Sequence, residues 1–204
     1  NVTAVIYQNQ SGATNSPPSA PTGLSIEIEG TDLIMEWDPS SDDKTPSEGL
    51  NYNLRIGTSD DNMDIFSALA DLDDGYRRIA AIGNTGSNTG WRITGLEFGG
   101  YHVSAQAVDP SWAGSPFSAS VFIELLPTAT FTVSDSVCVL EETTITYTGN
   151  ASPSAQYNWD FDGGNASPGS GQGPHIVYWE QPGLKTVTLT VTENGYTSDT
   201  YQQY

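Results

Sequence analysis

Short runs of alternating apolar and polar residues recur along the whole chain, and they constrain it to β-structure. Alternation of this kind places every second side chain on the same face of an extended strand. The clearest runs cover residues 33–37, 52–56, 101–107 and 186–191. Turn-forming residues separate these runs, and the 204-residue sequence contains 21 Gly and 12 Pro. We therefore expect an all-β protein made of many short strands.

Two breaks interrupt the alternating pattern. Residues 9–22 are rich in Ser, Pro and Asn, as expected of a linker, and Pro127 marks the second break. Residues 1–8 alternate and predict one strand, whereas segment 58–90 is long for a loop and is expected to hold a short helix or a strand pair. The predicted parts are an N-terminal strand and linker at 1–19, and two β-sandwiches at 20–126 and 128–204.

The charge of the chain is strongly one-sided. Lys and Arg number 6 against 25 Asp and Glu, for a net charge of -19. Such a field repels phosphate backbones, so nucleic acid is not an expected partner. No apolar run approaches the roughly 20 residues of a membrane span, so no membrane insertion is expected. Cys138 is the single cysteine and can form no intrachain disulfide, and a start at Asn1 is expected of a mature piece or fragment.

The sequence offers little for catalysis. Nucleophilic catalysis needs a base within hydrogen-bond reach of the nucleophile. The two histidines, His102 and His175, lie on predicted strands of different sandwiches. Transition metals lack ligands as well, because one Cys and two His do not make a zinc site. We therefore expect no enzyme activity and no organic cofactor.

Calcium is the cofactor that the composition does allow. Ca²⁺ prefers six to eight oxygen ligands, which carboxylates on loops supply. Two acidic loops provide the candidates, with solvated loops as the alternative interpretation. The candidate ligands are Asp38, Asp42, Asp43, Asp71, Asp73 and Asp74.

Exposed aromatic side chains are the candidates for sugar binding. Trp37 and Trp159 fall on alternating strands and are expected in the core. Trp112, in the loop after Asp109, and Trp179 are the best candidates for exposed rings. The alternative is that both pack against an edge of their sandwich, since Trp often covers apolar surface while one end stays wet.

Residues 18–125 resemble a fibronectin type III module. The resemblance rests on the opening at 18–24, on Trp37, and on the run from 93 to 109 with its Gly100-Tyr101 pair. It is most like the versions that follow integrin-like FG-GAP propellers in large bacterial surface proteins. The resemblance implies an immunoglobulin-like sandwich.

The second predicted sandwich resembles a PKD domain, named after the polycystic kidney disease protein. The motif residues are Tyr157 to Phe161, the His175 strand and residues 186–191. The sequence Trp-Asp-Phe-Asp-Gly-Gly at 159–164 swaps one Asp and Gly of the usual motif. Many secreted bacterial relatives pair a Cys near 138 with one near 196, where this chain has Tyr196. In addition, 135–137 resembles the Asp-Ser-Val O-glycosylation signal of some gliding bacteria, which makes Ser136 a candidate site.

These resemblances imply a non-catalytic spacer, scaffold or adhesion module at the surface of a bacterial cell or in a secreted protein. The expected partners are other domains of the same parent protein, or neighbouring subunits that pair through sheet edges. The alternative is a polysaccharide-binding accessory module of a secreted enzyme. Exposure of both Trp112 and Trp179 would favour that alternative.

Overall fold

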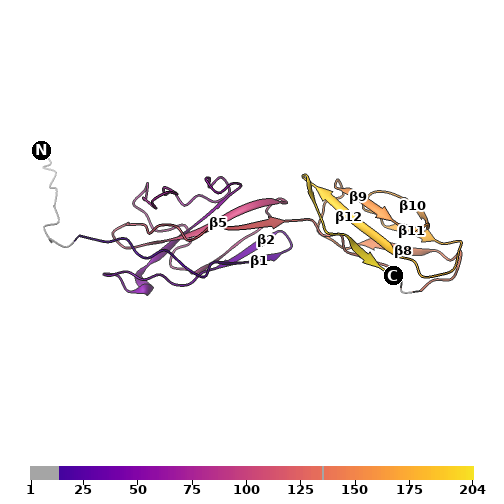
Figure 1. Ribbon diagram of the computed structural model, residues 1–204, viewed down its shortest axis with the longest axis horizontal. Helices are drawn as coiled ribbons and strands as arrows, with labels where there is room; N and C mark the ends of the chain where they lie inside the picture. The colour runs from indigo at the N-terminus through magenta and orange to yellow at the C-terminus, as the bar shows by residue number, and fades with distance from the viewer. Residues whose placement is uncertain (1–13, 135) are drawn as a thin grey trace, which may run out of the picture. The chain divides into compact units, whose positions relative to one another are not determined.

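The computed structural model describes residues 14–134 and 136–204, and in them the chain is all-β (Figure 1). The described residues contain fourteen strands in four antiparallel sheets and one short 3-10 helix, Ser47–Gly49, with no α-helix. The all-β prediction is therefore confirmed, while the strand expected at 1–8 lies outside the described residues. In this part of the chain no helix is long and apolar enough to cross a membrane.

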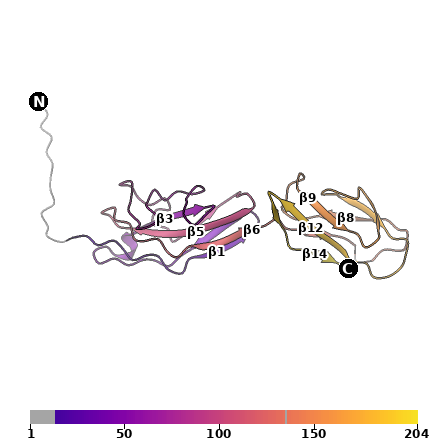
Figure 2. The ribbon, with the colours of Figure 1, turned by 45° about the horizontal axis from the view of Figure 1, so that its top comes forward.

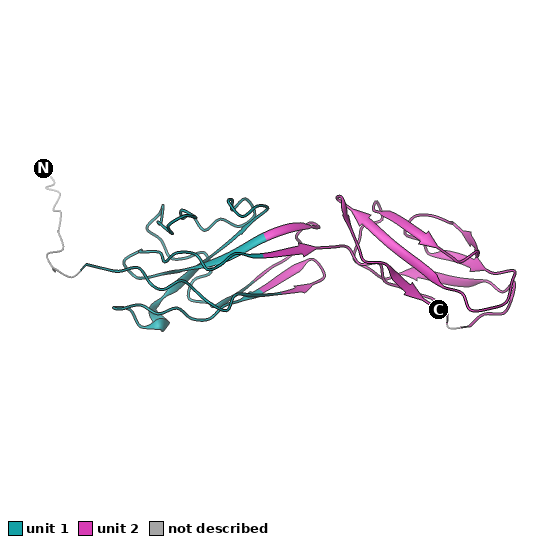
Figure 3. Ribbon diagram, in the orientation of Figure 1, with its two compact units in different colours: residues 1–26, 35–91, 102–121 teal, residues 27–34, 92–101, 122–204 magenta. Residues whose placement is uncertain are grey.

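Contacts between Cα atoms divide the chain into two compact units (Figure 3). The first comprises the described part of Asn1–Ile26 with Met35–Trp91 and His102–Val121. The second comprises Glu27–Ile34, Arg92–Tyr101 and Phe122–Tyr204. The domain limits drawn from the sequence, 20–126 and 128–204, stay a prediction.

Two three-stranded sheets hold the strands before residue 126. One has the order β1 (Ser25–Glu29), β2 (Asp32–Glu36), β4 (Gly90–Ile93). The other has the order β3 (Asn51–Gly57), β5 (Gly99–Val108), β6 (Val121–Leu125), with β3 and β5 side by side in Figure 2. Trp37 follows β2 and meets Tyr52 of β3 edge-on, with ring centroids 5.9 Å apart. Two sheets that share such a core are consistent with a β-sandwich.

Two further sheets hold the remaining strands. The first has the order β10 (Asn165–Ser167), β11 (His175–Tyr178), β8 (Thr143–Tyr147), β7 (Phe131–Thr132). In the second, β12 (Val187–Glu193) pairs with β13 (Tyr196–Thr197), β14 (Tyr201–Gln203) and β9 (Gln156–Asp160). Phe131, Ile145, Val177 and Leu189 are buried at alternate positions. The period-two pattern of the sequence thus marks the core of this part.

Segment 58–89 forms neither the helix nor the strand pair that we expected, and that prediction is wrong. It is irregular and touches the sheet through isolated bridges such as Ile56 with Phe66, and it closes one turn by bridging Ala70 and Arg77. All seven residues of β3 are buried. The polar residues of β3, including Asn53 and Arg55, are therefore covered rather than solvated.

Tyr157 of β9 should titrate at unusually high pH. Its ring lies edge-on to that of Tyr147, with centroids 5.0 Å apart, and its hydroxyl donates to the Ser152 carbonyl at 2.8 Å. Burial and the neighbouring Tyr147 raise the pKa of Tyr157 to about 12. A raised pKa means that the folded state keeps a proton that the unfolded state loses, so this stabilisation is complete below pH 10 and is lost towards pH 12.

Phenolate absorbance during an alkaline titration measures this effect. We expect Tyr157→Phe to remove the component that titrates last and to leave the components of lower pKa in place. A spectrum in which the removed component titrates near the ordinary tyrosine pKa, about 10, would contradict the assignment.

Candidate functional site

A surface hollow of about 600 Å³ opens beside Trp112, and all of its lining belongs to the first compact unit. Residues 74–80 form one wall, residues 111–114 form the other, and Pro17 closes one side. The volume is within the range of small-ligand sites. Trp112 also lines a second, smaller hollow of about 300 Å³, so its indole stands between two concave surfaces.

The turn that presents Trp112 is held by a buried carboxylate. Asp109 is fully buried, and its Oδ1 accepts hydrogen bonds from the Ser111 and Ala113 amides at 2.8 and 2.9 Å. Trp112 sits between them with φ of 68°. A bulky side chain in this left-handed region is a genuine outlier and persists only where its surroundings enforce it. The indole is 38% exposed, so the turn holds an aromatic ring at the surface in a fixed place.

The side chain of Gln106, on β5, connects the two segments that form the walls of the hollow. Its buried Nε2 donates to the carbonyls of Gly75 and Ser115 at 2.6 and 2.8 Å, and Asn53 donates to its Oε1 at 2.8 Å. Residues 75 and 114 approach so closely that a Cβ at Gly114 would lie 2.6 Å from the Gly75 carbonyl oxygen. Nothing in the sequence marks Gln106 as part of a site, because a polar residue at an alternate strand position is normally solvent-facing.

Two adjacent arginines bring positive charge to the hollow. Arg77 is 8% exposed, and its Nη2 donates to the Ala81 carbonyl at 2.7 Å. Its buried Nε and Nη1 have no hydrogen-bond partner in the described residues, where it also makes no ion pair. Burial alone lowers the pKa of Arg77. Arg78 is exposed and lies 3.5 Å from Asp71.

The predicted exposed tryptophans separate in the structure. Trp112 is exposed, as expected. Trp179 is only 7% exposed, and its indole N–H donates to the Phe161 carbonyl at 2.8 Å, so its predicted exposure is wrong. Its amphipathic ring packs and hydrogen-bonds in the core instead. Ser136 is exposed, while the preceding residue lies outside the described part of the chain.

Five of the six candidate calcium ligands make local contacts through a carboxylate oxygen, all but Asp73, while the buried Asp42 Oδ1 has no hydrogen-bond partner in the described residues. Asp42 accepts from the Lys44 and Thr45 amides at 3.0 and 2.7 Å, and Asp43 pairs with the Lys44 ammonium at 2.8 Å. Asp71 and Asp74 accept from the amides two residues further on, at 3.0 and 2.8 Å. Asp38 accepts from Thr22 Oγ1 at 3.2 Å. Within residues 14–134 and 136–204, no three acidic, His or Cys side chains gather as a metal-binding group, and calcium stays a prediction.

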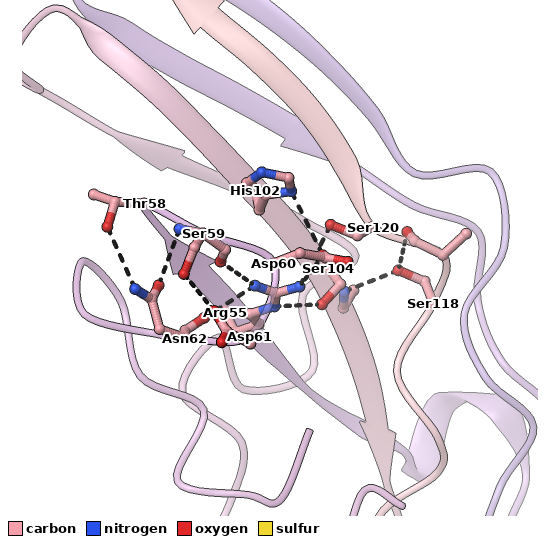
Figure 4. A network of polar contacts seen from close by, with 12 residues as sticks. Arg55, Thr58, Ser59, Asp60, Asp61, Asn62, His102, Ser104, Ser118 and Ser120 are labelled. Carbon is pink, nitrogen blue, oxygen red and sulfur yellow. Dashed lines mark hydrogen bonds and ion pairs between the residues drawn. The ribbon is translucent and has the colours of Figure 1, made fainter. Parts of the chain in front are cut away.

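A second polar network surrounds Arg55 (Figure 4). Its guanidinium donates to Ser104 at 2.9 Å, to the carbonyls of Ser59 and Asn62 at 3.3 and 2.9 Å, and to Asp60 at 3.0 Å. His102 Nδ1 lies 3.5 Å from the same Asp60 carboxylate. These contacts tie loop 58–62 to β3 and β5.

His175 is fully buried on β11. Its Nδ1 lies beside the Pro168 carbonyl, and its Nε2 lies 3.3 Å from the Gly171 carbonyl. Its ring packs edge-on against Trp159, with centroids 4.9 Å apart. Both histidines therefore make contacts that hold loops to strands.

No protein-family model and no curated protein matches this chain.

Proposed function

We propose that the chain is a non-catalytic structural and adhesion module of a larger secreted or cell-surface bacterial protein. In this proposal its two parts are immunoglobulin-like sandwiches, the first of fibronectin type III type and the second of PKD type. The observation that carries the adhesive role is the Trp112 hollow. It combines a fixed, exposed aromatic ring with walls braced by a buried glutamine, and binding surfaces are typically loops held by a rigid scaffold.

The same hollow supports a second candidate, a polysaccharide-binding accessory module attached to an enzyme. Sugars stack their apolar C–H faces on aromatic rings, and Trp112 and Tyr76 supply two such rings, with Tyr76 72% exposed. The burial of Trp179 removes the second ring that the sequence suggested. The two candidates differ in the parent protein, so the sequences that flank this segment separate them.

Trp112→Ala tests whether the hollow binds glycans at all. We expect the wild-type chain to be retarded by at least one polysaccharide in affinity electrophoresis, and Trp112→Ala to lose that retardation. Removal of one stacking ring should cost about 1–2 kcal/mol of binding free energy, or roughly 5- to 30-fold in affinity. Trp112→Phe, which keeps a ring, is the matched control and should retain part of the binding. Equal retardation of wild type and Trp112→Ala would show that any glycan binding lies elsewhere.

A further inference from the structure

We propose that the Trp112 hollow binds a sugar that carries a carboxylate, namely a hexuronic acid unit of an acidic polysaccharide. This inference rests on the proposed glycan-binding role and adds the chemical class of the ligand. It depends on the charges that line the hollow.

Arg77 is a buried cation that lacks a counter-ion among the described residues. Arg55 is also buried, yet its guanidinium donates to two carbonyls, two hydroxyls and a carboxylate. Arg77 makes one hydrogen bond, to Ala81, and two of its nitrogens are unpaired within the described residues. An uncompensated buried charge destabilises a fold. Those two nitrogens are closed to solvent, so a ligand anion in the hollow that Arg77 lines would offset this cost through its charge and not by a hydrogen bond to them.

Positive charge is concentrated at the Trp112 hollow. Arg77 and Arg78 are two of only 6 basic residues in a chain with 25 acidic ones, and both line this hollow. Asp74 is the single carboxylate of the lining. Its Oδ1 is engaged with the Tyr76 amide at 2.8 Å. The lining therefore carries two cations and one carboxylate on an acidic protein, and Asp71, outside the lining, lies 3.5 Å from Arg78.

The lining of the hollow combines this positive charge with aromatic rings. Trp112 and Tyr76 line the same surface as the two arginines. A hexuronate presents an apolar C–H face for the rings and a planar carboxylate that matches a guanidinium. Nucleic acid combines rings with charge as well, but its dense phosphates are repelled by the net charge of -19.

The net charge also predicts the salt dependence of binding. Repulsion between the acidic protein and an acidic oligosaccharide acts over a distance and is screened by salt, with a Debye length of about 10 Å at 0.1 M. Contacts to a partly buried guanidinium are screened much less. Affinity should therefore hold or rise as salt increases from about 0.05 to 0.3 M, whereas binding by general charge attraction would weaken.

The test is calorimetric titration of the whole chain with uronic acid oligosaccharides and with their methyl esters. The probes are oligomers of galacturonate, glucuronate, mannuronate and guluronate. Each ester keeps the sugar rings and removes the charge. The ratio of the association constants of acid and ester, the acid-to-ester ratio, therefore isolates the contribution of the carboxylate to affinity. We expect at least one acid to bind roughly ten-fold more tightly than its ester, as one hydrogen bond to a charged group provides.

Four variants locate the effect. Arg77→Met and Arg78→Gln should each bring the acid-to-ester ratio towards one, and circular dichroism checks that both are folded. Asp74→Asn keeps the acceptor for the Tyr76 amide and removes the opposing charge, so it should raise the ratio. Lys44→Gln removes one positive charge outside the hollow and should leave the ratio unchanged.

Two results would overturn the inference while leaving the glycan-binding role intact. One is equal affinity of the wild-type chain for acids and esters. The other is tighter binding of sulfated oligosaccharides than of any uronate, which would assign the hollow to sulfate esters. If no oligosaccharide of any charge binds, the proposed adhesive role of the hollow fails as well.

Discussion

Arg55→Met should lower the free energy of unfolding by about 3–5 kcal/mol. The side chain of Arg55 is 4% exposed, and its guanidinium satisfies acceptors on β5, on loop 58–62 and at Ser120. Met keeps the apolar stem, so the volume of the core changes little. The loss comes from acceptors that stay buried without a donor, each of which costs about 1–3 kcal/mol.

The matched control is Arg77→Met. Arg77 is similarly buried but makes one hydrogen bond and no ion pair among the described residues, so its replacement should cost little or even stabilise the chain. Urea unfolding followed by fluorescence measures both variants. Amide hydrogen exchange in β3 and β5 should be faster in Arg55→Met than in the wild-type chain. If the two variants destabilise the chain equally, burial rather than hydrogen bonding decides the role of Arg55.

The contrast between these two arginines also shows how far the sequence could predict this structure. Alternation identified the strands and their core faces, as with Leu33, Met35 and Trp37, because period-two patterning follows from the geometry of the pleat. The same alternation would place the polar residues Asn53, Arg55 and Gln106 on a solvent-facing side, yet all three are buried. Segment 58–89 covers that side, and no local pattern encodes which loop covers a sheet.

The site was predictable to the extent that it depends on local turn chemistry. Asp109, followed by Pro and Ser, indicated a loop that exposes Trp112, and the structure bears out that exposure. The other wall of the hollow comes from residues some thirty positions earlier, and it is joined to the first through Gln106. Trp179 shows the converse case. The sequence offered it as an exposed candidate, but the Phe161 carbonyl, which also accepts from the Gly164 amide, supplies a buried partner for its indole N–H.

His175→Ala should be the most damaging single change among the strands after residue 126, with a loss of about 3 kcal/mol or more. The imidazole is fully buried and packs edge-on against the stacked rings of Trp159 and Phe161, with centroids at 4.9 and 5.3 Å. Alanine would leave a cavity against both aromatic rings. It would also leave the Pro168 and Gly171 carbonyls without the ring nitrogens that face them.

Ile176→Ala is the matched control for His175→Ala, because the two residues are neighbours on β11 and point to opposite faces of the sheet. Ile176 is 38% exposed, so its truncation removes fewer buried contacts and should cost less than about 1 kcal/mol. Hydrogen exchange should speed up in β8 and β11 for His175→Ala alone, since His175 pairs with Ile145 of β8. A similar cost for both variants would mean that strand pairing, and not the buried imidazole, stabilises this region.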